Sequence, residues 1–340
     1  MRATSFHRGL LALALASSVT ACSFGGDDEE TTTAAAAVEG KGGNGKTVKI
    51  AFSAPAADHG WMAAVTRFAE QQAEQYDDVE FMATEGAADS ANQIAQVESL
   101  IARDPDVLVI LPNEGGALTQ VAQQAMEAGI QVVNIDRKFT APSAYRTFIT
   151  GDNYGIGFQA GNYIADELQC KGNVVEIQGI AGISVTTDRS KGFTDAIQKC
   201  DGGLKVVASQ PADFVPDKGQ AVMQNILQAQ KQIDAVYTHD DDMAQGVVAA
   251  IKEAGREDEM FVTGAGGSKQ VMEQIQAGDV FRATFLYNPV MSASAINLAR
   301  LIGQDAGLTE LREPEVPSEI VLPATKVTKD NAADVLDLGF

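Results

Sequence analysis

The feature that most constrains the fold of this chain is a regular alternation of short apolar runs with longer helix-like runs, beginning near residue 46. The runs 107–111 and 132–135 are apolar almost throughout, and do not alternate between apolar and polar residues. Such strands are typical of parallel sheets whose two faces are both covered by helices. The pattern predicts an α/β fold of doubly wound parallel sheets. The expected strands cover residues 48–53, 79–83, 107–111, 132–135, 148–150, 174–178, 206–210, 235–238, 261–264 and 281–286, and the expected helices cover residues 62–76, 90–103, 116–128, 155–168, 188–199, 218–230, 241–254 and 269–277.

The length of the chain indicates more than one domain. At 340 residues it is expected to form about two, taking roughly 150 residues for each. The chain has more strand and helix units than a single sheet usually contains. The run Gly-Asp-Asn-Tyr-Gly at 151–155 is the natural boundary, because Gly and Asn permit a sharp hinge.

The first 21 residues have the composition of an export signal. Arg2 and Arg8 accompany a short run of apolar and small residues, well below the roughly 20 apolar residues that span a bilayer. Val-Thr-Ala-Cys at 19–22 resembles a bacterial lipobox, in which the signal is cleaved before a cysteine that is then lipid-modified. A buried core cysteine is the alternative, but nothing around Cys22 could form a core. We expect a signal peptide over 1–21, a lipid on Cys22 and a disordered tether over 22–46.

The charge balance restricts the partners of the exported chain. Removal of the signal takes away two arginines and no acids, which leaves 23 basic against 46 acidic residues. A strongly negative protein is not expected to bind nucleic acid or anionic lipid headgroups electrostatically. The charge does not identify a cationic ligand, because acidic surfaces commonly serve solubility.

Two cysteines remain beyond Cys22. Cys170 and Cys200 each follow a helical run and precede a strand, and in an exported protein such a pair favours a disulfide. If the two following strands are adjacent and parallel, the bridge would join neighbouring loops on the side away from a ligand. Two buried free thiols are the alternative.

Several motifs suggest chemistry that their context does not support. Residues 40–47 match the phosphate-binding pattern G-x-x-x-x-G-K-[ST], but that loop should leave a strand and enter a helix, whereas this one enters a strand. The glycines at 155–161 fit a helix start better than a dinucleotide fingerprint. Beyond the signal, only His59 and His239 remain as histidines, and no metal-ligand spacing or catalytic triad is recognisable. We expect no metal, no cofactor and no enzymatic activity.

Acidic residues follow two of the predicted strands. Asp136 and Arg137 end the run 132–135, and ligands of open α/β sheets bind outside the carboxyl ends of strands. A surface ion pair is the alternative for these two residues. In His-Asp-Asp-Asp at 239–242, one aspartate is expected to cap the next helix, and Asp240 is placed to accept hydrogen bonds from ligand hydroxyls.

Taken together, the strand-end segments resemble the periplasmic sugar-binding proteins of the ribose/galactose-binding type, the substrate-binding components of ABC transporters. The resemblance runs from about residue 46 to the end of the sequence. It implies two lobes that close over a sugar, joined by three crossings of the chain. It places residues 47–150 and about 288–315 in the N-terminal lobe, and residues 151–287 and about 316–340 in the C-terminal lobe. The matching segments are 134–137, 151–153, 178–182, 188–193, 210–214 and 241–244.

The resemblance also implies a set of ligand-binding residues. Carboxylates and guanidinium groups make charge-assisted hydrogen bonds to hydroxyls, and an aromatic ring can cover the C–H face of a sugar. A buried core position remains the alternative for both aromatic residues of this set. The set comprises Asp136 and Arg137 from the first lobe, Arg189, Phe214 and Asp240 from the second lobe, and Trp61 over the apolar face of the sugar.

Three departures from the family pattern concern the ligand. Gly266 stands where an aspartate is common, and Tyr287 stands where a polar residue such as glutamine is common. Asp58-His59-Gly60-Trp61 also differs from the Asn-Pro-aromatic pattern of ribose binders. We therefore expect a hexose, deoxysugar, polyol or cyclitol in place of ribose, with His59, Tyr287 and Asp58 as further ligand-binding residues.

The function that the sequence predicts is capture of a small neutral polyhydroxylated solute by a monomeric, lipid-anchored protein that delivers it to an ABC permease. A binder of a non-sugar signal or a nucleoside would share the fold and the mechanism. An exported glycosidase using Asp136 and Asp240 is a further alternative. A transcription regulator of similar fold is disfavoured, because no basic helix-turn-helix precedes residue 48.

Overall fold

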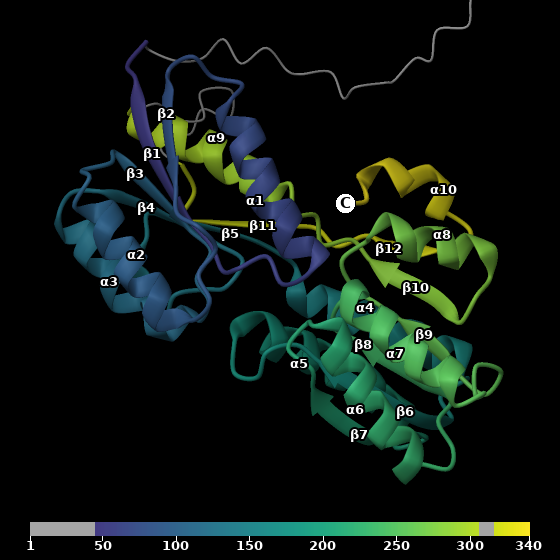
Figure 1. Cartoon of the computed structure of the whole chain (residues 1–340). Helices are drawn as coiled ribbons and strands as arrows, with labels where there is room; N and C mark the ends of the chain where they lie inside the picture. Colours follow the sequence, from purple (N-terminus) through teal and green to yellow (C-terminus); the bar gives the residue numbers. More distant parts are fainter. Residues whose placement is uncertain (1–44, 306–315) are drawn as a thin grey trace, which may run out of the picture. The chain divides into compact units, whose positions relative to one another are not determined.

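The computed structural model describes residues 45–305 and 316–340, which form two α/β lobes with one six-stranded sheet each (Figure 1). The expected signal peptide, Cys22 and nearly all of the expected tether lie outside the described residues, as does most of the phosphate-loop-like run at 40–47. No helix within the two described ranges is long and apolar enough to cross a membrane.

The sheet of the N-terminal lobe has the order β11-β5-β4-β3-β1-β2, and all of its strand pairs are parallel. Both faces of this sheet are apolar. Helices α1 and α9 cover one face, and α2 and α3 cover the other. The strands are β1 (Val48–Ser53), β2 (Val79–Ala83), β3 (Val107–Ile110), β4 (Gln131–Ile135), β5 (Thr147–Gly151) and β11 (Glu319–Leu322), and the helices are α1 (Gly60–Ala73), α2 (Ser90–Ile101), α3 (Gly115–Glu127) and α9 (Met291–Gly303).

The sheet of the C-terminal lobe has the order β12-β10-β9-β8-β6-β7, and β12 pairs antiparallel with β10 at its edge. Helices α4 and α5 pack on one face, and α6, α7 and α8 pack on the other. The strands are β6 (Gly172–Gln178), β7 (Leu204–Pro211), β8 (Ala235–Thr238), β9 (Phe261–Thr263), β10 (Phe281–Phe285) and β12 (Lys326–Thr328), and the helices are α4 (Asn153–Glu167), α5 (Ser184–Ile197), α6 (Pro216–Ala229), α7 (Asp241–Glu253), α8 (Lys269–Ala277) and α10 (Ala332–Val335).

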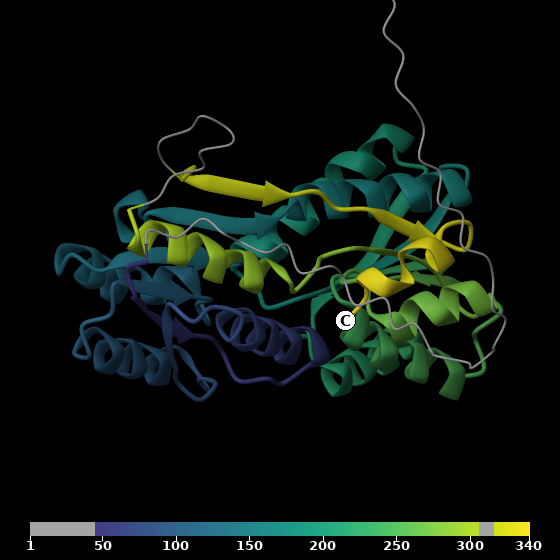
Figure 2. The ribbon, with the colours of Figure 1, turned by 90° about the horizontal axis from the view of Figure 1, so that it is seen from above.

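The chain crosses between the lobes three times, after β5, after β10 and after β11. The last crossing corrects the predicted boundary, which placed residues 316–340 in the C-terminal lobe. Strand β11 pairs with β5 from Phe148 to Gly151 and so belongs to the N-terminal sheet, and only the segment after Leu322 enters the C-terminal lobe. Figure 2 shows β11 alongside β5 before the chain continues to β12. The four residues of β11 carry too little periodicity for the sequence to reveal this pairing.

Cys170 and Cys200 form a disulfide, with their Cα atoms 5.1 Å apart. The two cysteines precede β6 and β7, which are adjacent and parallel as the prediction of this bridge required. Because they lie before the amino ends of these strands, the bridge joins neighbouring loops at the edge of the sheet opposite to the carboxyl ends.

Candidate functional site

A cavity of about 330 Å³ lies at the carboxyl ends of the strands of both sheets. This figure is the empty space between the lining residues, part of which is open to solvent, and the space that the centre of a water molecule can enter is about 20 Å³. Every residue predicted to bind ligand lines the cavity except Asp58, which contacts His59 behind it. The lining residues are His59, Trp61, Asp136, Arg137, Val185, Arg189, Phe214, Asp240, Ala265, Gly266 and Tyr287.

Asp136 enters the cavity from the end of β4 in a left-handed backbone conformation, with φ of 62°. The hydroxyl of Tyr287 donates a hydrogen bond to Oδ1 of Asp136. Asn153 Nδ2 donates to the Tyr287 oxygen at 3.2 Å, and the Thr150 hydroxyl lies 3.3 Å from it. Burial, then the negative charge of Asp136, raises the pKa of Tyr287, so the tyrosine stays neutral and serves as a donor. Tyr287 therefore orients one oxygen of the Asp136 carboxylate.

Arg137 is held beside Asp136 by backbone carbonyls. Its Nη1 donates to the carbonyl oxygen of Asn113 at 2.7 Å, and its Nε lies 3.6 Å from Oδ2 of Asp136. Burial lowers the pKa of Arg137, and the charge of Asp136 opposes that effect. The side chains of Arg137 and Asp136 are only 5% and 4% exposed, so they do not form the surface ion pair that was the alternative from the sequence. The pair is buried in the cavity wall, where unpaired hydrogen-bonding groups are costly.

Arg189 reaches the cavity from the opposite lobe, on α5. Its Nε donates to Oδ1 of Asn153 at 2.9 Å, and its Nη1 donates to the carbonyl oxygen of His239. The guanidinium carbon lies 4.6 Å from the centroid of the Tyr287 ring, within the range of a cation–π interaction. Helix α5 can come this close to α4 because Gly157 has no side chain. A Cβ at that position would lie 1.9 Å from the carbonyl oxygen of Arg189. Gly157 thus permits the close helix packing that places Arg189 at the cavity.

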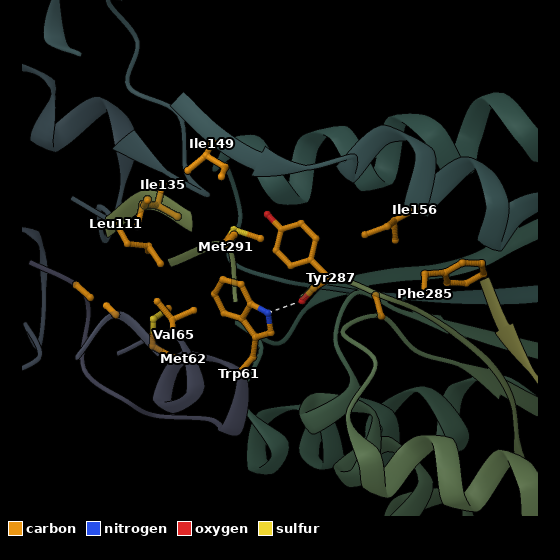
Figure 3. Packing of buried hydrophobic residues seen from close by; sticks show 14 of the residues in the cluster. Trp61, Met62, Val65, Leu111, Ile135, Ile149, Ile156, Phe285, Tyr287 and Met291 are labelled. Atoms are coloured by element: carbon orange, nitrogen blue, oxygen red, sulfur yellow. Dashed lines mark hydrogen bonds between the residues drawn. The ribbon is translucent and has the colours of Figure 1, made fainter. Parts of the chain in front are cut away.

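Trp61 belongs both to the apolar core and to the cavity wall. The residue is 5% exposed, its ring centroid lies 5.4 Å from that of Tyr287, and its Nε1 donates to the Tyr287 carbonyl oxygen at 2.7 Å. Figure 3 shows this hydrogen bond and the neighbouring side chains of Met62, Val65 and Met291. The side chain therefore belongs to the core, which was the alternative, and also lines the cavity where a ligand contact was predicted.

His59 and Phe214 form the rest of the aromatic wall, with ring centroids 6.2 Å apart. His59 Nδ1 and Asp58 Oδ1 are 2.6 Å apart. Burial opposes protonation of His59, but the hydrogen bond to Asp58 and the charges of nearby aspartates outweigh it and raise the pKa of His59. Phe214 has φ of 67°, and Gly179 makes room for its ring, since a Cβ there would lie 2.0 Å from it.

Asp240 is the aspartate of the acidic cluster that caps the next helix, and its contact with ligand hydroxyls stays a prediction. Its Oδ1 accepts from the Met243 amide at 2.9 Å and caps α7, and the residue also lines the cavity. Burial raises the pKa of Asp240 to about 7, with an opposing effect from His59 and a further increase from Asp242. A group that titrates near neutrality in a cleft is typical of functional sites.

Asp241 does not line the cavity but binds the loop that contains Gly266. Its Oδ2 accepts from the amides of Gly267 and Ser268, both at 2.8 Å, and its carboxylate also accepts from the Thr284 hydroxyl. Burial raises the pKa of Asp241 to about 6. Gly266 itself lines the cavity with φ of 133° and has no side chain with which to contact a ligand.

Sequence reasoning missed Asn153, which joins Arg189 to Tyr287. Its place just after β5 was a signal, but the segment 151–153 was interpreted as a hinge and as a match to the family, and Asn153 was given no role in the site. It also missed Glu176, whose Oε1 lies 3.1 Å from His239 Nε2 and accepts from the Ser190 hydroxyl at 2.7 Å. Burial opposes ionisation of Glu176, but the hydrogen bond and charge of His239 lower its pKa to about 2. No group of acids, histidines and cysteines in the described ranges could hold a metal ion.

Comparison with known proteins extends the similarity over both lobes. The family model described as periplasmic binding protein domain matches residues 50–305. The galactofuranose-binding protein of Escherichia coli strain K12 is 33% identical over 299 residues, covering 86% of this chain and 92% of that protein. The crystal structure of a galactofuranose binding protein matches with a TM-score of 0.79 at 30% identity, over 85% of this chain and 97% of that chain. A Mycobacterium smegmatis protein in complex with β-D-fucofuranose matches with a TM-score of 0.79 at 27% identity, over 86% of this chain and 94% of that chain.

Proposed function

Since the chain belongs to the periplasmic binding protein family, we propose that it captures a small neutral polyhydroxylated solute between its lobes and delivers it to an ABC permease. Binding is the whole activity. Lobe closure follows from ligand contacts made to both lobes, because a ligand shifts a conformational equilibrium only by its differential affinity for the two states. The family places the protein outside the cytoplasm.

The observation that carries this proposal is the mixed lining of one cavity by both lobes. Asp136 and Arg137 come from the first lobe, and Arg189 and Asp240 come from the second. Hydrogen bonds between such charged groups and ligand hydroxyls contribute roughly 1.5–3 kcal/mol each. Because the lining contains both basic and acidic groups, the ligand needs no net charge.

The aromatic wall and the absence of a side chain at Gly266 narrow the range of solutes that the cavity would bind. Rings of Trp61, Phe214 and Tyr287 line the cavity, whereas Gly266 offers no side chain for a hydroxyl. The proteins similar to this chain are named for galactofuranose or hold fucofuranose. We therefore propose a hexose or deoxyhexose in its five-membered ring form as the solute.

A thermal-shift screen tests the proposal. D-galactose, D-fucose, L-arabinose, D-ribose, myo-inositol and a set of nucleosides would each be added, together with two anhydrohexitols locked in a five-membered or a six-membered ring. Stabilisation by D-galactose or D-fucose and by the five-membered anhydrohexitol alone is expected. Stabilisation only by nucleosides would overturn the sugar assignment. Release of free sugar from added galactofuranosides would instead favour the glycosidase alternative.

The attachment to the membrane is a separate part of the proposal. Val-Thr-Ala-Cys at 19–22 supports a lipid on Cys22, and residues 23–46 would serve as the tether. Incorporation of labelled palmitate into the wild-type protein and its loss in Cys22→Ala is expected. Light scattering of the protein without its signal and lipid is expected to give the mass of a monomer.

A further inference from the structure

A carboxylate from the C-terminal lobe contacts the first helix of the N-terminal lobe outside the cavity. Asp242 lies in the first turn of α7, and its Oδ2 accepts a hydrogen bond from the backbone amide of Trp61 at 3.1 Å. Asp242 does not line the cavity. The contact joins the two lobes through groups that leave the ligand site free.

The amino end of α1 obtains no cap from its own segment. His59 occupies the N-cap position without a side-chain hydrogen bond to the helix, because its ring is engaged with Asp58, and the first turn contains no acid. Helix amino ends carry unsatisfied N–H groups and a partial positive charge, which an adjacent carboxylate stabilises. Asp242 therefore caps α1 from the opposite lobe.

Gly60 leaves the space that this approach requires. A Cβ at Gly60 would lie 3.0 and 3.1 Å from the two carboxylate oxygens of Asp242. Distances of that size are shorter than ordinary van der Waals contact, so a side chain at this position would press against the carboxylate. The first residue of α1 is thus suited to a cap arriving from outside.

Trp61 is consequently held at both ends by other elements. Asp242 binds its backbone amide, and the Tyr287 carbonyl oxygen binds its indole nitrogen at 2.7 Å. We infer that Asp242 is a positioning residue, which holds Trp61 in the cavity wall both with and without solute, and adds affinity without touching the solute. This inference rests on the proposed function, because it assigns Asp242 to the closing of that same site.

A second hydrogen bond between the lobes provides a matched comparison. The backbone amide of Lys138 donates to the hydroxyl of Ser184, the first residue of α5, at 3.1 Å. Ser184 also does not line the cavity, and its contact does not involve Trp61. Its loss is expected to weaken closure while leaving the environment of Trp61 unchanged.

Trp61 is the only tryptophan of the chain, so its fluorescence reports directly on this contact. The experiment titrates D-galactose, D-fucose and L-arabinose into wild type, Asp242→Ala, Asp242→Asn and Ser184→Ala. Asp242→Ala is expected to weaken binding of each sugar roughly 10-fold, with the order of preference unchanged and the emission of the bound form shifted to longer wavelength. Asp242→Asn keeps an acceptor oxygen and is expected to recover part of the affinity. Ser184→Ala is expected to weaken binding without the emission shift.

Asp217→Ala is the control for the loss of an acid from a first helical turn, because Asp217 occupies that position in α6, is exposed and has no contact across the lobes among the described hydrogen bonds. It should leave affinity and emission unchanged. Wild-type affinity and emission in Asp242→Ala would overturn the inference, and so would a changed order of preference, which would place Asp242 in contact with the sugar. If no sugar binds the wild-type protein, the proposed function fails. The role of Asp242 is then decided by acrylamide quenching of Trp61 without sugar, which should be stronger in Asp242→Ala and would overturn the inference if equal.

Discussion

The hydroxyl of Tyr287 donates its hydrogen bond to the carboxylate of Asp136, so a residue that follows β10 orients the principal acid at the end of β4. The two residues are far apart in the sequence and follow strands of different sheets. Tyr287 stands where the resemblance noted in the sequence leads us to expect a polar residue such as glutamine. Its ring fits because Gly151 carries no side chain, and a Cβ there would lie 2.4 Å from the ring.

Tyr287→Phe should destabilise the protein without sugar. The change keeps the ring contacts with Trp61 and Arg189 but leaves the buried carboxylate of Asp136 without its hydroxyl donor. Loss of one partner of a buried charged group costs about 1–3 kcal/mol in the free energy of unfolding, to be measured by urea denaturation. Tyr154→Phe is the control, because the Tyr154 hydroxyl bonds to Asp195 at an exposed position and its loss should cost little.

Asp136→Ala and Arg189→Ala should each abolish the thermal stabilisation given by D-galactose or D-fucose. The two side chains line the cavity from opposite lobes, so each removal deletes the contacts of one lobe and the linkage between ligand and closure. Circular dichroism and unfolding without sugar establish that each variant folds. Wild-type shifts in both folded variants would mean that the ligand site lies elsewhere.

Asp240→Asn should increase stability most at alkaline pH. Burial raises the pKa of Asp240 to about 7, above the value of a free aspartate, so the folded state binds the proton more tightly than the unfolded state. The resulting stability is complete below about pH 4 and is lost as the pH rises through about 7. Asparagine can still cap α7 and does not titrate. The free energy of unfolding of Asp240→Asn relative to wild type should rise between about pH 5 and pH 8 by on the order of 2 kcal/mol. A constant difference across this range would contradict the assignment.

Gly179→Ala should weaken sugar binding by displacing Phe214. The added methyl would lie 2.0 Å from the Phe214 ring, which is itself held in a left-handed backbone conformation and has little freedom to move. Overpacking of this kind costs about 1–3 kcal/mol in stability. Gly116→Ala near the start of α3, where the nearest neighbour is the flexible side chain of Glu114, should be neutral or stabilising. Sugar titration and thermal unfolding of both variants check the prediction.

Much of the site could be predicted because strand ends are visible in the sequence. Asp136 and Arg137 directly follow β4, Asp240 lies two residues after β8, and parallel strands bring their carboxyl ends to one edge of a sheet. Asn153 and Glu176 escaped prediction, because their importance depends on the hydrogen bonds they make to Arg189, Tyr287 and His239. Such partners are distant in the sequence and leave no local pattern.

Periodicity by itself determined the α/β class, the positions of most strands and helices, and the residues that stand at the strand ends, because burial on both faces imposes a continuous apolar pattern. Only the tertiary structure decided that β11 completes the N-terminal sheet, that Trp61 serves both the core and the cavity, and that Asp242 caps α1 from the other lobe. These relationships depend on backbone pairing and side-chain distances between segments far apart in the chain. Local propensity contains no information about them.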